Sequence, residues 1–156
     1  MELSRLTLRQ HLSYGICAIA LVCSLSLYKS TVAANPLSAA QKHWQAIASE
    51  NPELLAMRYS DDAVLERSYG ALDGDEVYKG HSIYSAWQRF FEQYQIRDFK
   101  VVEQQQRDRA VEAQIQITAQ SSRGPIVVLS MSYQVQFDRT GKIVKEVWQA
   151  NPELSV

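Results

Sequence analysis

The chain is poor in the residues that build several common kinds of site. Its 156 residues include two cysteines and three histidines, and its formal net charge is −1. Such a charge argues against a dedicated nucleic-acid binder, which would carry a basic patch. The Gly-x-Ser-x-Gly, phosphate-loop, dinucleotide-binding and zinc-site spacings do not occur in the sequence. We therefore expect no metal and no cofactor.

The N-terminal segment lacks charge in its middle. Residues 10–28 carry no formal charge and residues 16–22 are continuously apolar, after a start that contains two arginines. Small residues follow at 32–34. This order is typical of a secretory signal peptide. We expect residues 1–34 to be cleaved and residues 35–156 to form a domain exported to the periplasm or secreted.

Two consequences follow from this division. Both cysteines, Cys17 and Cys23, lie in the predicted signal peptide, so the exported domain would hold neither a disulfide nor a thiolate. The alternative to cleavage is an uncleaved membrane anchor, although the apolar stretch is short for a spanning helix. Contact with a membrane is expected only in that case.

The exported part is predicted to begin with helices and end with strands. Helical spacing of apolar residues, with Ser38 as an N-cap, Asn51-Pro52 as a restart and His81 as a cap, predicts three helices. Strict apolar–polar alternation later in the chain predicts half-buried antiparallel strands. The fold class is therefore α+β. The helices are expected at residues 38–50, 52–59 and 81–94, a long loop at 68–80, and strands at 63–67, from 99, and at 110–121, 126–138 and 143–149.

Three short segments resemble a known superfamily. Residues 59–66 read Tyr-Ser-Asp-Asp-Ala-Val-Leu-Glu, residues 78–83 contain Gly80 before Ile83, and residues 87–91 are rich in aromatics. Together they resemble the nuclear-transport-factor-2-like (NTF2-like) superfamily, with its SnoaL-like and ketosteroid-isomerase-like branches. The resemblance covers about residues 38–150. It implies a cone in which three N-terminal helices pack on a curved antiparallel sheet, with an apolar pocket at one end.

The resemblance also bears on catalysis. Where the ketosteroid-isomerase branch has its carboxylate base, this chain has Arg67, and a guanidinium cannot accept a proton. Where that branch has a hydrogen-bond-donating tyrosine, this chain has His43. His43 could act as a general acid or base with a carboxylate from elsewhere, such as Glu146. The plainer interpretation of His43 is a partly exposed helix residue beside Trp44.

Several further side chains are candidates for the pocket. Arg67 could pair with an anionic ligand or form a salt bridge to a neighbour. Aromatic residues at helical and strand spacing could line the pocket or belong to the core. The acidic turn at residues 73–76 lacks the ligands of a calcium loop. The expected ligand-binding residues are Arg67, Tyr69, Trp87, Phe91, Tyr133 and Trp148.

Three functions remain open from the sequence. The first is an exported SnoaL-like domain that binds a small, largely apolar ligand without evident catalysis. The second is a small isomerase, cyclase or dehydratase-like enzyme that uses His43 and a pocket carboxylate. The third is a homodimeric interaction module that pairs through the sheet. The pocket discriminates between these functions. A closed cone filled by side chains would defeat both small-molecule hypotheses, whereas an open pocket with His43 within hydrogen-bond reach of a buried carboxylate would favour the enzyme.

Overall fold

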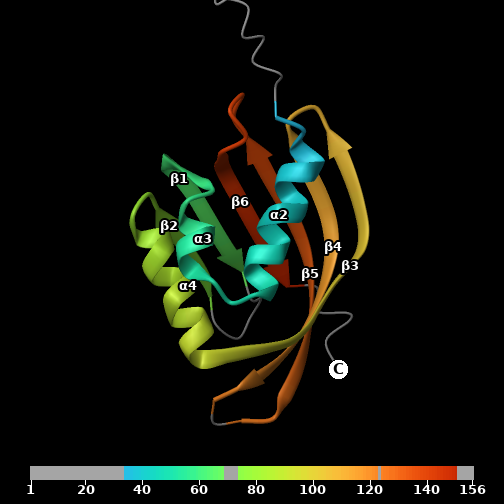
Figure 1. Ribbon diagram of the computed structural model, residues 1–156. Helices are drawn as coiled ribbons and strands as arrows, with labels where there is room; N and C mark the ends of the chain where they lie inside the picture. Colours follow the sequence, from blue (N-terminus) through green and yellow to red (C-terminus); the bar gives the residue numbers. More distant parts are fainter. Residues whose placement is uncertain (1–33, 69–73, 123, 151–156) are drawn as a thin grey trace, which may run out of the picture. The chain divides into compact units, whose positions relative to one another are not determined.

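A computed structural model describes residues 34–68, 74–122 and 124–150, so the predicted signal peptide, apart from Ala34, and Tyr69 lie outside the described residues. Three helices and six strands are present in the described part (Figure 1). Among these residues no helix is long and apolar enough to span a membrane. The helices are α2 (Pro36–Ala48), α3 (Pro52–Ala56) and α4 (Ser82–Gln93).

The starts of the helices follow from local capping chemistry. The Asn35 side chain accepts hydrogen bonds from the backbone N–H groups of residues 37 and 38, and Pro36 occupies the first helical position of α2. The prediction that Ser38 caps this helix is therefore wrong, because the Asn-Pro pair begins the helix earlier. Asn51 caps α3 as predicted. His81 makes no capping hydrogen bond to α4.

The strands form one six-stranded sheet in the order β2-β1-β6-β5-β4-β3. Strands β1 and β6 pair in parallel, whereas all other neighbours are antiparallel. The predicted antiparallel sheet is thus corrected to a mixed one, because the first strand inserts beside the last. The strands are β1 (Tyr59–Ser68), β2 (Asp75–Lys79), β3 (Tyr94–Arg107), β4 (Ala110–Ser121), β5 (Ile126–Phe137) and β6 (Ile143–Ala150).

Strand β2 lies within the segment predicted to be a loop. Its alternation of exposed and half-buried residues is weak, and it is an edge strand that pairs only with β1 among the described elements. Gly80 ends it with a φ of 51°, and a Cβ at this position would lie 2.6 Å from the backbone oxygen of Asp61. A glycine is therefore required where β2 turns into α4.

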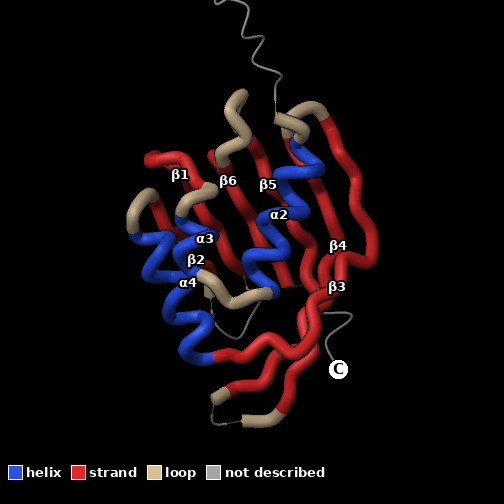
Figure 2. The backbone as a smooth tube through the Cα atoms, viewed as in Figure 1, coloured by secondary structure: helices blue, strands red, loops and turns tan. Residues whose placement is uncertain are grey.

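The helices cover one face of the sheet (Figures 1 and 2). The apolar residues of β4 and β5 that alternate in the sequence turn their side chains to this face, as predicted, and pack with the buried faces of α2 and α4. The core consequently lies between the helices and the sheet. The opposite face of β4 carries the polar residues of the alternation, including Gln114, which is exposed.

A bulge in β6 sets which of its residues face the core. The pairing of β5 with β6 shifts register near Val144. Ile143 and Glu146 are both fully buried, although strict alternation would place residues three positions apart on opposite faces. Trp148 follows Glu146 on the buried face. The bulge therefore brings the carboxylate of Glu146 into the core between the helices and the sheet.

Candidate functional site

A histidine and a carboxylate meet in the interior between α2 and the sheet. His43 lies on the buried face of α2 and Glu146 on β6, and neither side chain has any exposed surface. The Nε2 atom of His43 lies 2.9 Å from Oε1 of Glu146. The partly exposed position considered for His43 is therefore wrong, since the helix turns this side chain fully into the core.

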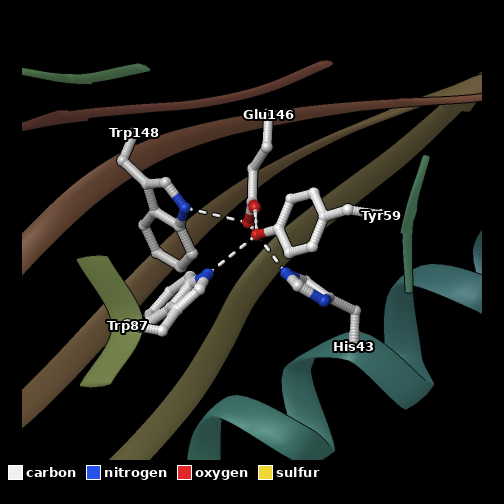
Figure 3. Close-up of polar contacts among 5 residues, drawn as sticks. All are labelled: His43, Tyr59, Trp87, Glu146 and Trp148. Atoms are coloured by element: carbon white, nitrogen blue, oxygen red, sulfur yellow. Dashed lines mark hydrogen bonds and ion pairs between the residues drawn. The ribbon is translucent and has the colours of Figure 1, made fainter. Parts of the chain in front are cut away.

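Three further side chains complete a hydrogen-bonded cluster around Glu146 (Figure 3). The hydroxyl of Tyr59, the first residue of β1, donates to Oε2 of Glu146. The indole of Trp148 donates to Oε1 over 2.9 Å. The indole of Trp87, on α4, donates to the Tyr59 hydroxyl over 2.9 Å. We call these five residues the interior cluster.

The interior cluster favours the ionised form of its carboxylate. Burial by itself raises the pKa of Glu146, but the charge of protonated His43 and the hydrogen bonds from His43, Tyr59 and Trp148 hold that pKa below its usual value. Burial, and then the negative charge of Glu146, raise the pKa of Tyr59 well above its usual range. The carboxylate of Glu146 is therefore compensated locally by the side chains around it.

This geometry limits what the cluster can do chemically. Glu146 already accepts three hydrogen bonds, and its lowered pKa makes it a weak base. The Tyr59 hydroxyl is engaged both as donor and as acceptor. The Nδ1 atom of His43 is buried and has no hydrogen-bond partner among the described residues. In the cluster, the Nδ1 atom of His43 is thus the ring nitrogen without a partner in the described part of the chain, and neither carboxylate oxygen of Glu146 faces solvent.

A second charged side chain is buried nearby without such compensation. Arg67 on β1 is 5% exposed. Its guanidinium carbon lies 4.2 Å from the ring centre of Trp87 and 5.4 Å from that of Phe90. No carboxylate among the described residues forms an ion pair with it, and its Nη2 atom has no hydrogen-bond partner there. The salt bridge considered from the sequence is not formed within the described residues.

Arg67 borders a small apolar cavity of about 20 Å³. This volume is of the order of one water molecule, so this part of the interior is nearly filled by side chains, which by itself argues against a bound small molecule. The lining contains one charged group and six apolar residues, and His43 and Glu146 are not among them. We call this place the mouth site; it is lined by Arg67, Trp87, Phe90, Ile117, Leu129, Met131 and Trp148.

The structure distributes the other candidate residues over different places. Phe91 stacks on Trp87 with ring centres 5.7 Å apart, but it does not line the cavity. Tyr133 is buried against Trp148, 4.6 Å between ring centres, on the side away from Arg67. Tyr69 lies outside the described residues. Trp87 and Trp148 belong to both the interior cluster and the mouth site.

Four residues of these sites are not among the sequence candidates: Tyr59, Ile117, Leu129 and Met131. Tyr59 belongs to the family-like segment, and Phe90 is one of the aromatic residues for which both the pocket and the core were open. The signal for Tyr59 was the alternation that places it on the same face as Leu65 and Arg67. Phe90 lies one helical turn from Trp87, at the spacing that puts two side chains on one face.

No group of histidine, cysteine, aspartate and glutamate suited to holding a metal ion is found within residues 34–68, 74–122 and 124–150. The interior cluster has two potential ligand side chains, His43 and Glu146, and the carboxylate is occupied by hydrogen-bond donors. The residues described here thus offer no metal centre.

Comparisons by sequence find no relatives. No protein-family model matches the chain, and no curated protein matches it. Similarity is found among solved structures.

Three solved structures illustrate this similarity. RV0760c from Mycobacterium tuberculosis, in complex with estradiol-17beta-hemisuccinate, has a TM-score of 0.66 and 14% identity over 79% of this chain and 99% of that one. A protein with a ketosteroid-isomerase-like fold from Catenulispora acidiphila DSM 44928, in complex with trimethylamine, has a TM-score of 0.61 and 12% identity over 70% and 82%. An NTF-2-like protein of unknown function from Burkholderia xenovorans LB400 has a TM-score of 0.56 and 22% identity over 74% and 82%.

The fold expected from the resemblance is thereby confirmed. The chain is similar in structure to NTF2-like and ketosteroid-isomerase-like proteins, and its described part has an NTF2-like α+β fold with three helices and a six-stranded mixed sheet. At these identities the likeness concerns the fold, which hosts many unrelated functions. The function has to be argued from the interior cluster and the mouth site.

Proposed function

We propose that this protein binds a small, largely apolar ligand at the mouth site, without evident catalysis. The observation that carries the proposal is the composition of that site, where six apolar side chains and one uncompensated guanidinium converge. Apolar walls with a few polar groups are the usual form of small-ligand sites. Two of the structural neighbours are described in complexes with a steroid derivative and with trimethylamine.

The size of the cavity bears on how a ligand enters. A volume of about 20 Å³ admits no organic molecule. Phe90 and Leu129 are only partly buried, whereas Trp87, Met131 and Trp148 are held in the core. We infer that the ligand displaces the Phe90 and Leu129 side chains toward solvent and takes their place against the indoles.

Native mass spectrometry of the protein purified from its own cells tests this proposal. We expect a bound species whose mass is that of a small organic molecule and which is lost after denaturation. The variant Leu129→Trp, which fills the mouth site, should lose the bound species. Leu54→Trp is the matched control, because Leu54 is an exposed leucine on α3. A protein that carries no small molecule, and that binds none from an apolar compound library, contradicts the proposal.

The enzyme hypothesis retains one observation, the 2.9 Å contact between His43 and Glu146. An enzyme would also need an open pocket at these residues, and neither His43 nor Glu146 has any exposed surface. The cluster therefore supports a structural role better than acid–base chemistry. Turnover of an apolar ketone or enol ether that is abolished by His43→Gln in a folded protein would reverse this order.

Export is the second part of the proposal. It rests on the order of basic, apolar and small residues before Asn35. N-terminal sequencing of the protein from its natural source should find a start near Asn35 in an extracytoplasmic fraction. A protein that begins at Met1 and stays in the cytosol contradicts export, whereas a membrane-bound protein with an intact N-terminus supports the anchor instead.

A homodimer through the outer face of the sheet is the third part. That face carries polar side chains around a hollow of about 370 Å³, among them Gln105, Gln114, Gln134 and Gln149. Polar surfaces with bridging water are common at interfaces that are not obligate. Sedimentation equilibrium should give a dimer mass, and Gln114→Lys with Gln134→Lys should shift it to a monomer by like-charge repulsion. A monomer at high concentration contradicts this part.

A further inference from the structure

The mouth site contains a charge that the described part of the protein does not neutralise. Arg67 is 95% removed from solvent, and its neighbours are the faces of Trp87 and Phe90. Its Nη2 atom is buried and makes no hydrogen bond within the described residues. A buried charge is normally paired, because leaving it unpaired costs several times more than an ordinary unmade hydrogen bond.

Two carboxylates lie on the strands that flank Arg67, and neither forms an ion pair with it. Glu76 stands opposite Arg67 in the pairing of β1 with β2 but takes part in none of the ion pairs found among the described residues. Glu146 lies on β6, and its carboxylate binds His43, Tyr59 and Trp148. The basic side chain that contacts Glu146 is His43 and not Arg67. The interior cluster therefore leaves the charge of Arg67 to be balanced by something else.

The surroundings of Arg67 indicate the kind of partner. A guanidinium presents planar N–H donors that match the two oxygens of a carboxylate. The π face of Trp87 is already covered by Arg67 at 4.2 Å, so this aromatic wall offers no free face to a cationic ligand. The remaining lining is apolar. The site thus combines one anion-binding group with a wall for an apolar body.

From this arrangement we infer that the ligand of the mouth site is a small apolar carboxylate, whose carboxylate group pairs with Arg67 and whose body takes the place of Phe90 and Leu129 beside Met131 and Trp148. This inference rests on the proposed function and makes it narrower. A carboxylate that binds here supplies the missing acceptor for Nη2. The ligand is thereby selected by charge as well as by shape.

A matched series of probes tests the inference on the full-length chain. Phenylacetate, 2-phenylethanol and 2-phenylethylammonium share a ring and a similar length but are anionic, neutral and cationic. By isothermal titration we expect phenylacetate to bind at least about 10-fold more tightly than the alcohol, as a charge-assisted hydrogen bond gives. The ammonium probe should bind more weakly than the alcohol, because Arg67 repels it.

Two variants assign the preference to Arg67. Arg67→Met keeps the length of the side chain without its charge, and it should bring phenylacetate and 2-phenylethanol to equal affinity. Arg89→Met is the matched control, because Arg89 is an exposed arginine on α4 that packs on Tyr78. It should keep the wild-type preference. Thermal melting of each variant verifies that it is folded.

The outcomes separate this inference from the proposed function. If the wild-type protein binds the anion and the alcohol equally well, or if Arg67→Met keeps the preference for the anion, the inference is wrong while ligand binding stands. If neither probe binds at millimolar concentration, the proposed function fails and the inference fails with it. Tightest binding of the ammonium probe would contradict the inference directly.

Discussion

The two buried charged places behind the helices differ in how their charges are balanced. In the interior cluster, Glu146 is surrounded by His43, Tyr59 and Trp148, so that its charge and lone pairs are satisfied by the protein itself. At the mouth site, Arg67 has aromatic faces around it and no carboxylate partner among the described residues. The two places lie on neighbouring strands and share Trp87 and Trp148.

On the proposed function, this difference separates a cluster that stabilises the core from a site that binds a ligand. A compensated buried pair contributes little net stability, but it penalises the loss of either partner and so fixes one arrangement of the core. An uncompensated charge lowers the stability of the empty protein and is retained where a ligand uses it. Removing groups from the two places should therefore change stability in opposite directions.

The largest effect is expected when the interior pair is broken from one side. His43→Leu leaves the buried carboxylate of Glu146 without its histidine partner, which should lower the free energy of unfolding by about 3–5 kcal/mol. Urea denaturation followed by tryptophan fluorescence measures this loss. The double variant His43→Leu with Glu146→Met removes both charges and should lose less than the single one. A double variant that is less stable than His43→Leu would contradict the compensation argument.

A smaller loss is expected when one hydrogen-bonding group of the cluster is removed. Tyr59→Phe deprives Glu146 of a donor and leaves the buried Trp87 N–H without its acceptor. Each buried group left unsatisfied costs about 1–3 kcal/mol, so the free energy of unfolding should fall by about that amount. Tyr84→Phe is the control, because the Tyr84 hydroxyl bonds to Glu53 at the surface. If the two variants lower the free energy of unfolding equally, the hydrogen bonds of the cluster contribute no more than a surface contact does.

The pH dependence of stability should carry the signature of Glu146. Its pKa in the folded protein is lowered from a usual value of 4.5, so the unfolded chain takes up the proton first as the pH falls. The stability contributed by Glu146 is fully present above that value and is lost as the pH falls through the folded pKa. The difference in unfolding free energy between wild type and Glu146→Gln should therefore shrink in acid. Glu92→Gln, at an exposed position on α4, serves as the control. If the difference between wild type and Glu146→Gln does not change with pH, the argument from Glu146 is wrong.

The sequence predicted which strand faces are buried and which charged residues matter, but it did not predict which of these residues lie next to each other. The alternation in β4 and β5 predicted their buried faces because a half-buried strand has a period of two. His43, Glu146 and Arg67 were all candidates. Their separation into a compensated pair and a lone cation depends on which strands lie side by side, and periodicity does not specify partners.

Two irregular features account for most of what the sequence missed. The parallel pairing of β1 with β6 joins segments that are far apart in the chain and brings Leu65 next to Glu146. The bulge near Val144 then decides which face of β6 is buried. A bulge leaves no clear mark in apolar patterning, so both faces of this strand remained possible. Strand β2 was missed for the related reason that an exposed edge strand needs little apolar alternation.

The smallest expected change in stability belongs to Arg67→Met. It tests the difference between the two buried places most directly, because this variant should be more stable than the wild type. Arg67→Met exchanges a desolvated charge for an apolar side chain of similar length and gives up the contact with Trp87, which is worth about 0.5–2 kcal/mol. Relief of the buried charge and of the unsatisfied Nη2 should exceed this loss, so the ligand-free protein should become more stable by about 1 kcal/mol, a rise in Tm of roughly 2–4 °C. Arg89→Met, which also loses an aromatic contact but at the surface, should change Tm by less than that. A destabilised Arg67→Met would mean that the aromatic faces alone compensate the cation, and the two buried places would then be alike.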